Sequence, residues 1–177
     1  MTTLVIVEGA ADRSFVEGIA EKLRIRCKVL QMRGNRPDKI RRLLIAYAKR
    51  LGEAVVLKDL HRGYKETTTL IDRLKEEIER LGNQGIRAQI VTVKRSVESW
   101  ILAGLSVNNP EEILNPEEVL KEIMQRRGRH YIKSPEVYRQ LAREIDIEKA
   151  ASKSGTFRRF IEILEAGDEP ARNIIIL

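Results

Sequence analysis

Short apolar runs alternate with helix-period segments over residues 1–107, and this alternation restricts the fold more than any other feature. Four runs have the β-branched composition of buried strands, at 4–7, 27–32, 54–57 and 87–93. Helical spacing of apolar residues follows them at 12–23, 37–51, 66–81 and beyond Ser96, which is suited to cap a helix. Strands that are apolar on both faces and joined by helices are typical of parallel sheets. We therefore expect an α/β fold with a mostly parallel sheet flanked by helices.

The last third of the chain changes character. From about Asn108 it shows only helical patterns, at 116–125, 135–144, 147–152 and 156–165. We expect an α/β core over residues 1–107 and a helical extension over 108–177 that packs on the same domain. The tail, Asn173 to Leu177, fits either a short edge strand or a docking segment.

Composition excludes several classes of protein. A chain of 177 residues is too short for two independent catalytic domains. One cysteine and two histidines exclude a disulfide framework and a structural zinc site. The longest apolar run is too short to cross a bilayer and no leader is seen, so we expect a cytoplasmic protein without a membrane partner. The net charge of +7 indicates a polyanionic partner such as nucleic acid, although thermal stability could also explain part of this charge.

Acidic residues follow three of the predicted strands. Glu8 and Asp12 come after the first strand, Asp59 with His61 after the third, and Glu98 after the fourth. The carboxyl ends of parallel strands form the ligand crevice of such sheets, so these groups should meet at one edge. Converging carboxylates repel one another, and a divalent cation such as Mg²⁺ or Mn²⁺ relieves the repulsion. Basic residues beside them would hold phosphate oxygens: Lys58, Arg62, Lys94 and Arg95.

Two motifs in this order resemble Toprim domains. Val5-Ile6-Val7-Glu8-Gly9-Ala10-Ala11-Asp12 resembles the first Toprim motif, and Val55-Val56-Leu57-Lys58-Asp59-Leu60-His61 lies where that family has its Asp-x-Asp motif. The chain is most similar to small stand-alone Toprim-like proteins related to the Toprim domains of OLD-type nucleases. That likeness includes Ser96 to Ala103, Tyr131 to Ser134 and Thr156 to Phe160, and so covers nearly the whole chain.

The resemblance implies a Toprim-like (Rossmannoid) fold and a metal-dependent phosphotransfer activity, with a nuclease acting on DNA or RNA as the leading hypothesis. Glu8 would organise the metal or act as general acid and base, Asp59 would be the main ligand, and Asp12 would support the site. His61 stands where the family has a second acid. The site could therefore prefer Mn²⁺, hold one metal, use Glu98 instead, or be degenerate.

Each of these residues also has a purely structural interpretation. Asp12 could cap the first helix, Glu98 could stabilise a helix dipole, Asp59 could form a turn and His61 could be an exposed loop residue. Trp100 is interpreted as a core aromatic. An arginine-rich loop around Gly128 could be a solvated loop, but we favour contact with nucleic-acid phosphates through Arg126, Arg127, Arg129 and Lys133.

Two alternatives to the nuclease stay open. The chain could be a non-catalytic module that binds nucleic acid or a nucleotide over a degenerate metal site, or the interaction subunit of a separate ATPase. The sequence contains no P-loop and no GxSxG motif, and Cys27 falls in a predicted strand, so covalent catalysis has no support. A homo-oligomer is compatible with any of the three hypotheses.

Overall fold

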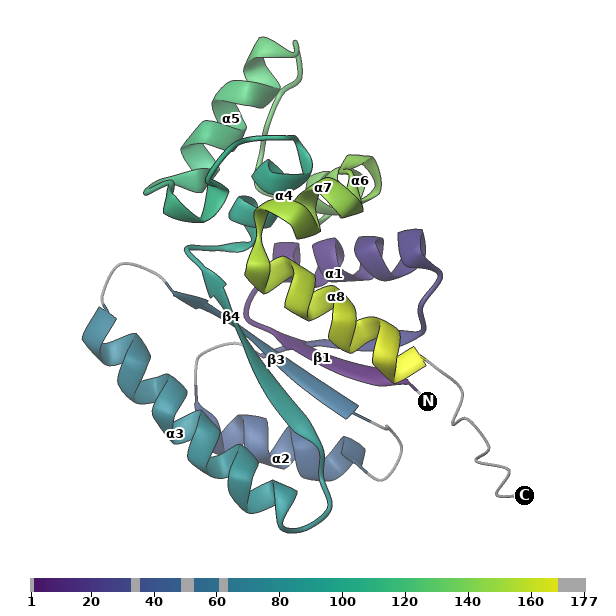
Figure 1. The fold of residues 1–177 in the computed structure, drawn as a ribbon, viewed down its shortest axis with the longest axis vertical. Coiled ribbons are helices and arrows are strands. Elements are labelled where there is room, and N and C mark those ends of the chain that lie inside the picture. The colour runs from purple at the N-terminus through teal and green to yellow at the C-terminus, as the bar shows by residue number, and fades with distance from the viewer. Residues whose placement is uncertain (1, 33–35, 49–52, 61–63, 169–177) are drawn as a thin grey trace.

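A four-stranded parallel sheet forms the centre of the protein (Figure 1). The computed structural model describes residues 2–32, 36–48, 53–60 and 64–168. The strand order is β2-β1-β3-β4, and every neighbouring pair is parallel. The strands are β1 (Thr3–Val7), β2 (Cys27–Gln31), β3 (Glu53–Leu60) and β4 (Ala88–Lys94). The prediction of an α/β fold with a parallel sheet flanked by helices is confirmed.

Both faces of the sheet are buried because its strands carry apolar side chains on both sides. Along β1, Val5 and Val7 belong to one core cluster, whereas Leu4 and Ile6 belong to a second cluster on the opposite face. The second face is covered by α2 (Pro37–Ala48) and α3 (Tyr64–Gly82), which lie together below the sheet in Figure 1. The first face is covered by α1 (Ala10–Leu23), α4 (Val97–Gly104) and the C-terminal helices.

The strand order reverses direction between β1 and β3. The chain leaves β1 through α1 toward β2, then crosses back through α2 to β3 on the other side of β1. In open parallel sheets the loops that leave the two central strands diverge at such a point and leave a crevice at the carboxyl edge. The topology therefore places the residues after β1 and at the end of β3 beside this crevice.

The last third of the chain is helical, at nearly the predicted boundaries. Its elements are η1 (Pro110–Glu112), α5 (Pro116–Arg126), α6 (Pro135–Glu144), α7 (Ile147–Lys153) and α8 (Gly155–Asp168). Helix α6 packs along α1, and α8 lies against β4 and β1. Trp100 of α4 is fully buried and stacks on Phe160 of α8 with a ring separation of 5.3 Å, which confirms its role as a core aromatic.

Two boundaries differ from the sequence-based expectation. The third strand does not end at Leu57 but continues through Lys58 and Asp59 to Leu60, because its pairing with β4 extends to Leu60 opposite Lys94. Helix α1 is capped by Gly9 rather than by Asp12, which is the third residue of the helix. The tail at 173–177 lies outside the described residues. Among those described, no helix is long and apolar enough to cross a membrane.

Candidate active site at the carboxyl edge of the sheet

Glu8 and Lys58 form an ion pair at the point where the strand order reverses. The parallel register pairs Ile6 with Val56, so two residues further along Glu8 lies beside Lys58. The Lys58 ammonium donates a hydrogen bond to the Glu8 carboxylate, and its side chain is only 3% exposed. Lys58, predicted to hold phosphate, therefore already has a carboxylate partner.

Asp59 lies on the opposite face of β3 from Lys58. Leu57 contributes to the core cluster under α1 and α4, and the two-residue period of a strand directs Asp59 to the same side. Asp12 is on that side, at the start of α1, where its carboxylate accepts a hydrogen bond from the Gly9 backbone N–H at 3.0 Å. Asp12 therefore helps to cap α1, although it is the third residue of the helix and Gly9 is the N-cap.

The acidic groups at this edge act on one another. Burial, followed by the negative charges of Asp12, Glu8 and Glu98, raises the pKa of Asp59 well above its ordinary value. Burial and the charge of Glu98 likewise raise the pKa of Asp12, although the Gly9 N–H partly offsets them. Burial and neighbouring negative charge thus act together on the carboxyls of this edge.

Glu98 is the centre of a buried hydrogen-bond network that joins α4 to the helical extension. Its carboxylate accepts hydrogen bonds from the Lys133 ammonium, at 2.6 Å, and from the Tyr138 hydroxyl. Because Tyr138 has one hydroxyl proton, Tyr131 donates to Tyr138 over 2.9 Å. Burial alone would raise the pKa of Glu98, but the hydrogen bonds from Lys133, Ser96 and Tyr138 outweigh it and lower this pKa.

The same network perturbs its other members. Burial raises the pKa of Tyr131 to about 12, and burial together with the Glu98 charge also raises the pKa of Tyr138. Burial acts to lower the pKa of Lys133, but the hydrogen bond and charge of Glu98 overcome it and raise this pKa. These three groups therefore stay protonated at neutral pH. Sequence reasoning missed the role of Tyr138, because nothing local links it to Glu98.

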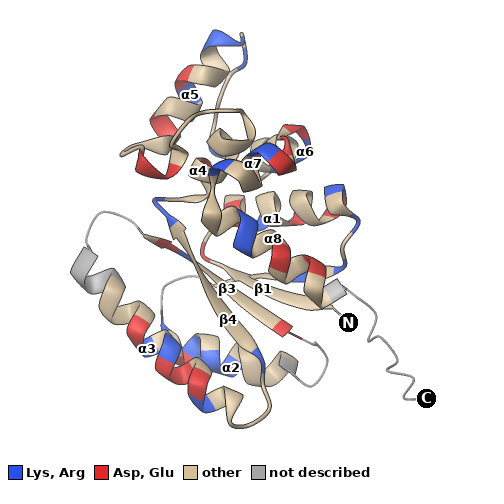
Figure 2. Ribbon diagram, viewed as in Figure 1, with Lys and Arg blue, Asp and Glu red and all other residues tan. Residues whose placement is uncertain are grey.

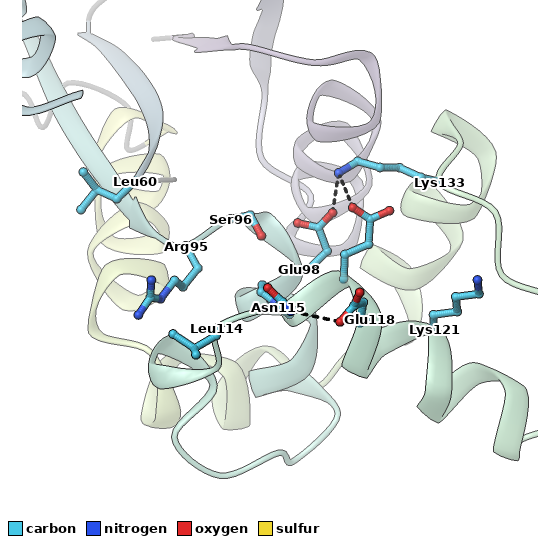
Figure 3. Close-up of a pocket in the computed structure, with 11 residues that line it drawn as sticks. Leu60, Arg95, Ser96, Glu98, Leu114, Asn115, Glu118, Lys121 and Lys133 are labelled. Carbon is cyan, nitrogen blue, oxygen red and sulfur yellow. Dashed lines mark hydrogen bonds and ion pairs between the residues drawn. The ribbon is translucent and has the colours of Figure 1, made fainter. Parts of the chain in front are cut away.

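A pocket of about 510 Å³ opens between the ends of β3 and β4 and the start of α5 (Figure 3). Glu98 and Lys133 lie in its wall, so it adjoins the acidic edge. Figure 3 shows Lys133 reaching both Glu98 and a second carboxylate, that of Glu117 at 3.3 Å. The described lining residues are Leu60, Arg95, Ser96, Glu98, Leu114, Asn115, Pro116, Glu117, Glu118, Lys121 and Lys133.

The predicted basic residues separate into different environments. Arg95 lies in the pocket wall and has a left-handed backbone conformation, with φ of 70°, which is uncommon for a residue other than glycine. Lys94 forms an ion pair with Glu111 at 3.3 Å. Arg129, predicted to contact phosphates, forms an ion pair with Glu144.

Arg126 and Arg127 lie at the far end of α5, where Figure 2 shows basic residues beyond the acidic start of that helix. Arg126 is within 3.6 Å of Glu122 one turn earlier, and both arginines are exposed. Neither lines the pocket described above. His61 and Arg62, two further predicted site residues, lie outside the described residues.

The donors present suit a hard divalent cation, but the described carboxylates are not assembled around one point. Glu8, Asp12, Asp59 and Glu98 offer oxygen ligands, which Mg²⁺ and Mn²⁺ prefer. In the described ranges, no group of three or more His, Cys, Asp or Glu side chains is arranged to hold a metal ion. Ion pairs with Lys58 and Lys133 occupy Glu8 and Glu98 instead.

Comparisons with known proteins assign the chain to no family. No protein-family model matches the chain, and no curated protein matches it. The Toprim resemblance therefore stays a prediction, and a functional proposal has to rest on the chemistry of the site.

Proposed function

We propose that this protein is a divalent-metal-dependent phosphotransfer protein, most simply a nuclease that acts on DNA or RNA phosphodiesters. The observation that carries the proposal is the group of carboxyls beside the β1–β3 crevice, where burial and, after it, repulsion between the carboxylates raise the pKa of Asp59 and Asp12. Carboxylates gathered at a strand edge repel one another, a bound cation relieves that repulsion, and groups with perturbed pKa values cluster at functional sites.

Asp59 and Glu8 would hold the cation, with Asp12 as a further ligand. Asp59 is the main candidate ligand, since the negative charges of Asp12, Glu8 and Glu98 all contribute to its raised pKa. When bound, Mg²⁺ or Mn²⁺ supplies polarisation of the phosphoryl oxygen and a lowered pKa for water. In the metal-free protein Lys58 holds the Glu8 carboxylate at this edge, and its ammonium would add positive charge near a bound phosphate.

The protein's own residues would prepare the site for an anionic substrate. Lys58 and Lys133 supply positive charge on either side of the acids, where they offset the charge of a phosphodiester. Glu8 could accept a proton from an attacking water or return it to the leaving oxygen. The buried network of Glu98, Tyr138 and Tyr131 fixes the position of Lys133.

Cleavage of labelled oligonucleotides tests this proposal. Wild-type protein should cut single-stranded DNA or RNA in Mg²⁺ or Mn²⁺ and lose this activity in EDTA. The Asp59→Asn variant should keep its far-UV circular dichroism but lose at least about 100-fold in rate, because a required metal ligand is removed. Asp72→Asn on the exposed surface of α3 is the matched control. Equal cleavage by wild type and Asp59→Asn contradicts the proposal.

The ion pairs of Lys58 with Glu8 and Lys133 with Glu98 support a second candidate function. Lysines that neutralise the acids without a metal are what a nucleic-acid-binding module over a degenerate site would contain. This module would bind nucleic acid in EDTA, with salt-sensitive affinity, and would cleave nothing. The cleavage experiment separates the two functions directly.

A further inference from the structure

The pocket beside the acidic edge has an uneven distribution of charge. Lys133 is engaged by Glu98 and Glu117, and Asn115 donates a hydrogen bond to Glu118 at 3.1 Å. Arg95 and Lys121 also line the pocket, and within the described ranges neither has an ion-pair partner. The lining holds as many acidic as basic side chains, but within the described ranges the positive charge that no carboxylate engages is at Arg95 and Lys121, and these two positions favour an anionic group of the ligand.

The pocket also presents an apolar surface next to this charge. Leu60, Leu114 and Pro116 line it, and Leu114 is 55% exposed, although large apolar side chains are usually buried. Figure 3 shows Leu60, Arg95 and Leu114 toward one side of the pocket, with Lys121 and Lys133 toward the other. A ligand that occupies the first side needs an anionic group and a flat or apolar group close together.

The middle of the pocket is polar. Asn115 and Glu118 present an amide and a carboxylate there, so the pocket offers both hydrogen-bond donors and acceptors. Asn and Glu side chains with this pattern can pair with the edge of a nucleobase. A volume of about 510 Å³ falls in the range of pockets that enclose one small ligand.

We propose that this pocket binds one unpaired nucleotide of the nucleic-acid strand next to the acidic edge. Its phosphate would contact Arg95, its base face would lie on Leu60 and Leu114, and its base edge would reach Asn115 and Glu118. This inference rests on the proposed function, which places the reacting phosphodiester at the adjacent carboxylates. The substrate is therefore a single strand or an unpaired end, since a base stacked inside a duplex does not enter a pocket.

Binding in the absence of metal tests the inference separately from cleavage. The probe is a fluorescein-labelled single-stranded octathymidylate, compared by fluorescence anisotropy in EDTA with a hairpin whose eight nucleotides are all paired and whose loop is an uncharged ethylene-glycol linker. The variants are Arg95→Ala, which removes the phosphate contact, and Leu114→Ser, which removes the base contact at an exposed position. Arg73→Ala, an exposed arginine on α3 that lies outside the pocket, is the charge-matched control.

The two variants should weaken binding in different ways. Arg95→Ala should weaken binding of the octamer about tenfold and reduce the slope of log affinity against log salt by about 0.7, as expected for one lost phosphate contact on a single strand. Leu114→Ser should weaken binding severalfold with the salt slope unchanged, because no charge is lost. Arg73→Ala should bind like wild type, and the hairpin should bind more weakly than the octamer.

Equal affinity of wild type and Arg95→Ala for the octamer overturns the inference, and so does equal affinity for octamer and hairpin. If Arg95→Ala binds the octamer as tightly as wild type does while Asp59→Asn abolishes cleavage, the pocket inference is wrong and the nuclease proposal stands. If the pocket variants behave as expected but wild type cleaves nothing in Mg²⁺ or Mn²⁺, the nuclease proposal is wrong and the pocket serves the binding module.

Discussion

Two consecutive residues of β3, Lys58 and Asp59, have opposite roles because a strand turns their side chains to opposite faces. Lys58 pairs with the Glu8 carboxylate, whereas Asp59 is directed to the α1 face of the sheet, where burial and the charges of Asp12, Glu8 and Glu98 raise its pKa. The sequence predicts that both lie at the strand edge. It does not predict this division of roles. The predicted strand ends before Lys58, so neither side chain could be assigned to one face of the sheet.

Asp59→Asn should stabilise the metal-free protein at pH 7. Burial and neighbouring acids raise the folded-state pKa of Asp59 above the unfolded value of 3.8, so ionising this carboxyl destabilises the fold as pH rises above that value. Asn keeps the shape and avoids the charge. We expect the melting temperature in EDTA to rise by about 2–4 °C, which corresponds to a gain of about 1 kcal/mol in the free energy of unfolding for a chain of this size.

The gain should shrink as pH falls and should be lost below 3.8, where Asp59 becomes protonated in the folded and unfolded states alike. Thermal melts at a series of pH values measure both trends. A variant that is less stable than wild type at pH 7, or equally stabilised at every pH, contradicts the assigned repulsion.

Lys133→Met should destabilise the fold, because it leaves the buried Glu98 carboxylate without its cation. Lys133 is 45% exposed, so water replaces part of the lost interaction, and we expect a loss of about 1–3 kcal/mol in the free energy of unfolding. Urea denaturation of Lys133→Met and Lys121→Met gives the comparison, since Lys121 lines the same pocket without an ion-pair partner in the described ranges. Equal stabilities would show that the pair contributes nothing.

At the scale of elements, the apolar periodicity predicts nearly every strand and helix. Pro37 begins α2, and Pro135–Glu144 forms α6 over the predicted span. The end of β3 was not predictable, because Lys58 and Asp59 lack the apolar character of a strand and are held there by the ladder with β4. Local composition thus predicts that a strand is present, whereas hydrogen bonding to the neighbouring strand determines where it ends.

Gly18→Ala should weaken the contact between α1 and α6. A Cβ atom at Gly18 would lie 2.7 Å from the Ala142 Cβ and 3.0 Å from the Arg139 carbonyl oxygen, so one helix would have to shift. Overpacking of this kind costs about 1–3 kcal/mol, which exceeds the gain of about 1 kcal/mol in helix propensity. Gly82→Ala is the control and should not destabilise the fold, because its new Cβ would lie within 4 Å of no atom beyond its chain neighbours and its own helix backbone. Equal urea midpoints for the two variants would contradict this packing.

At the scale of the whole molecule, the site combines groups that are distant in sequence. Lys133 and Tyr138 reach Glu98 across 35 and 40 residues, and Lys58 reaches Glu8 across 50. The sequence predicts that Glu8, Asp12, Asp59 and Glu98 meet at one edge of the sheet, and this convergence stays a prediction, because in the described ranges these carboxylates are not assembled around one point. The contribution of the helical extension could not be predicted, since it depends on how α6 packs along α1.

The extension and the sheet should unfold together. Trp100, the single tryptophan, stacks on Phe160, and its indole N–H donates to Thr156 at 2.9 Å, so its fluorescence reports their interface. Phe160→Ala should lower the free energy of unfolding by about 3–5 kcal/mol. Fluorescence and circular dichroism should give one coincident transition in wild type and variant. Separate transitions by the two probes would show that the extension folds independently.

Calorimetric titration of Mn²⁺ and Mg²⁺ into wild type and Asp59→Asn tests the central claim most directly. The account predicts binding at micromolar to sub-millimolar concentrations in wild type, loss of this binding in Asp59→Asn, and unchanged binding in the surface control Asp72→Asn. The preferred ion would also indicate whether a histidine ligand contributes. Absence of binding in wild type, or equal binding by wild type and Asp59→Asn, would contradict a metal site at the carboxyl edge of the sheet.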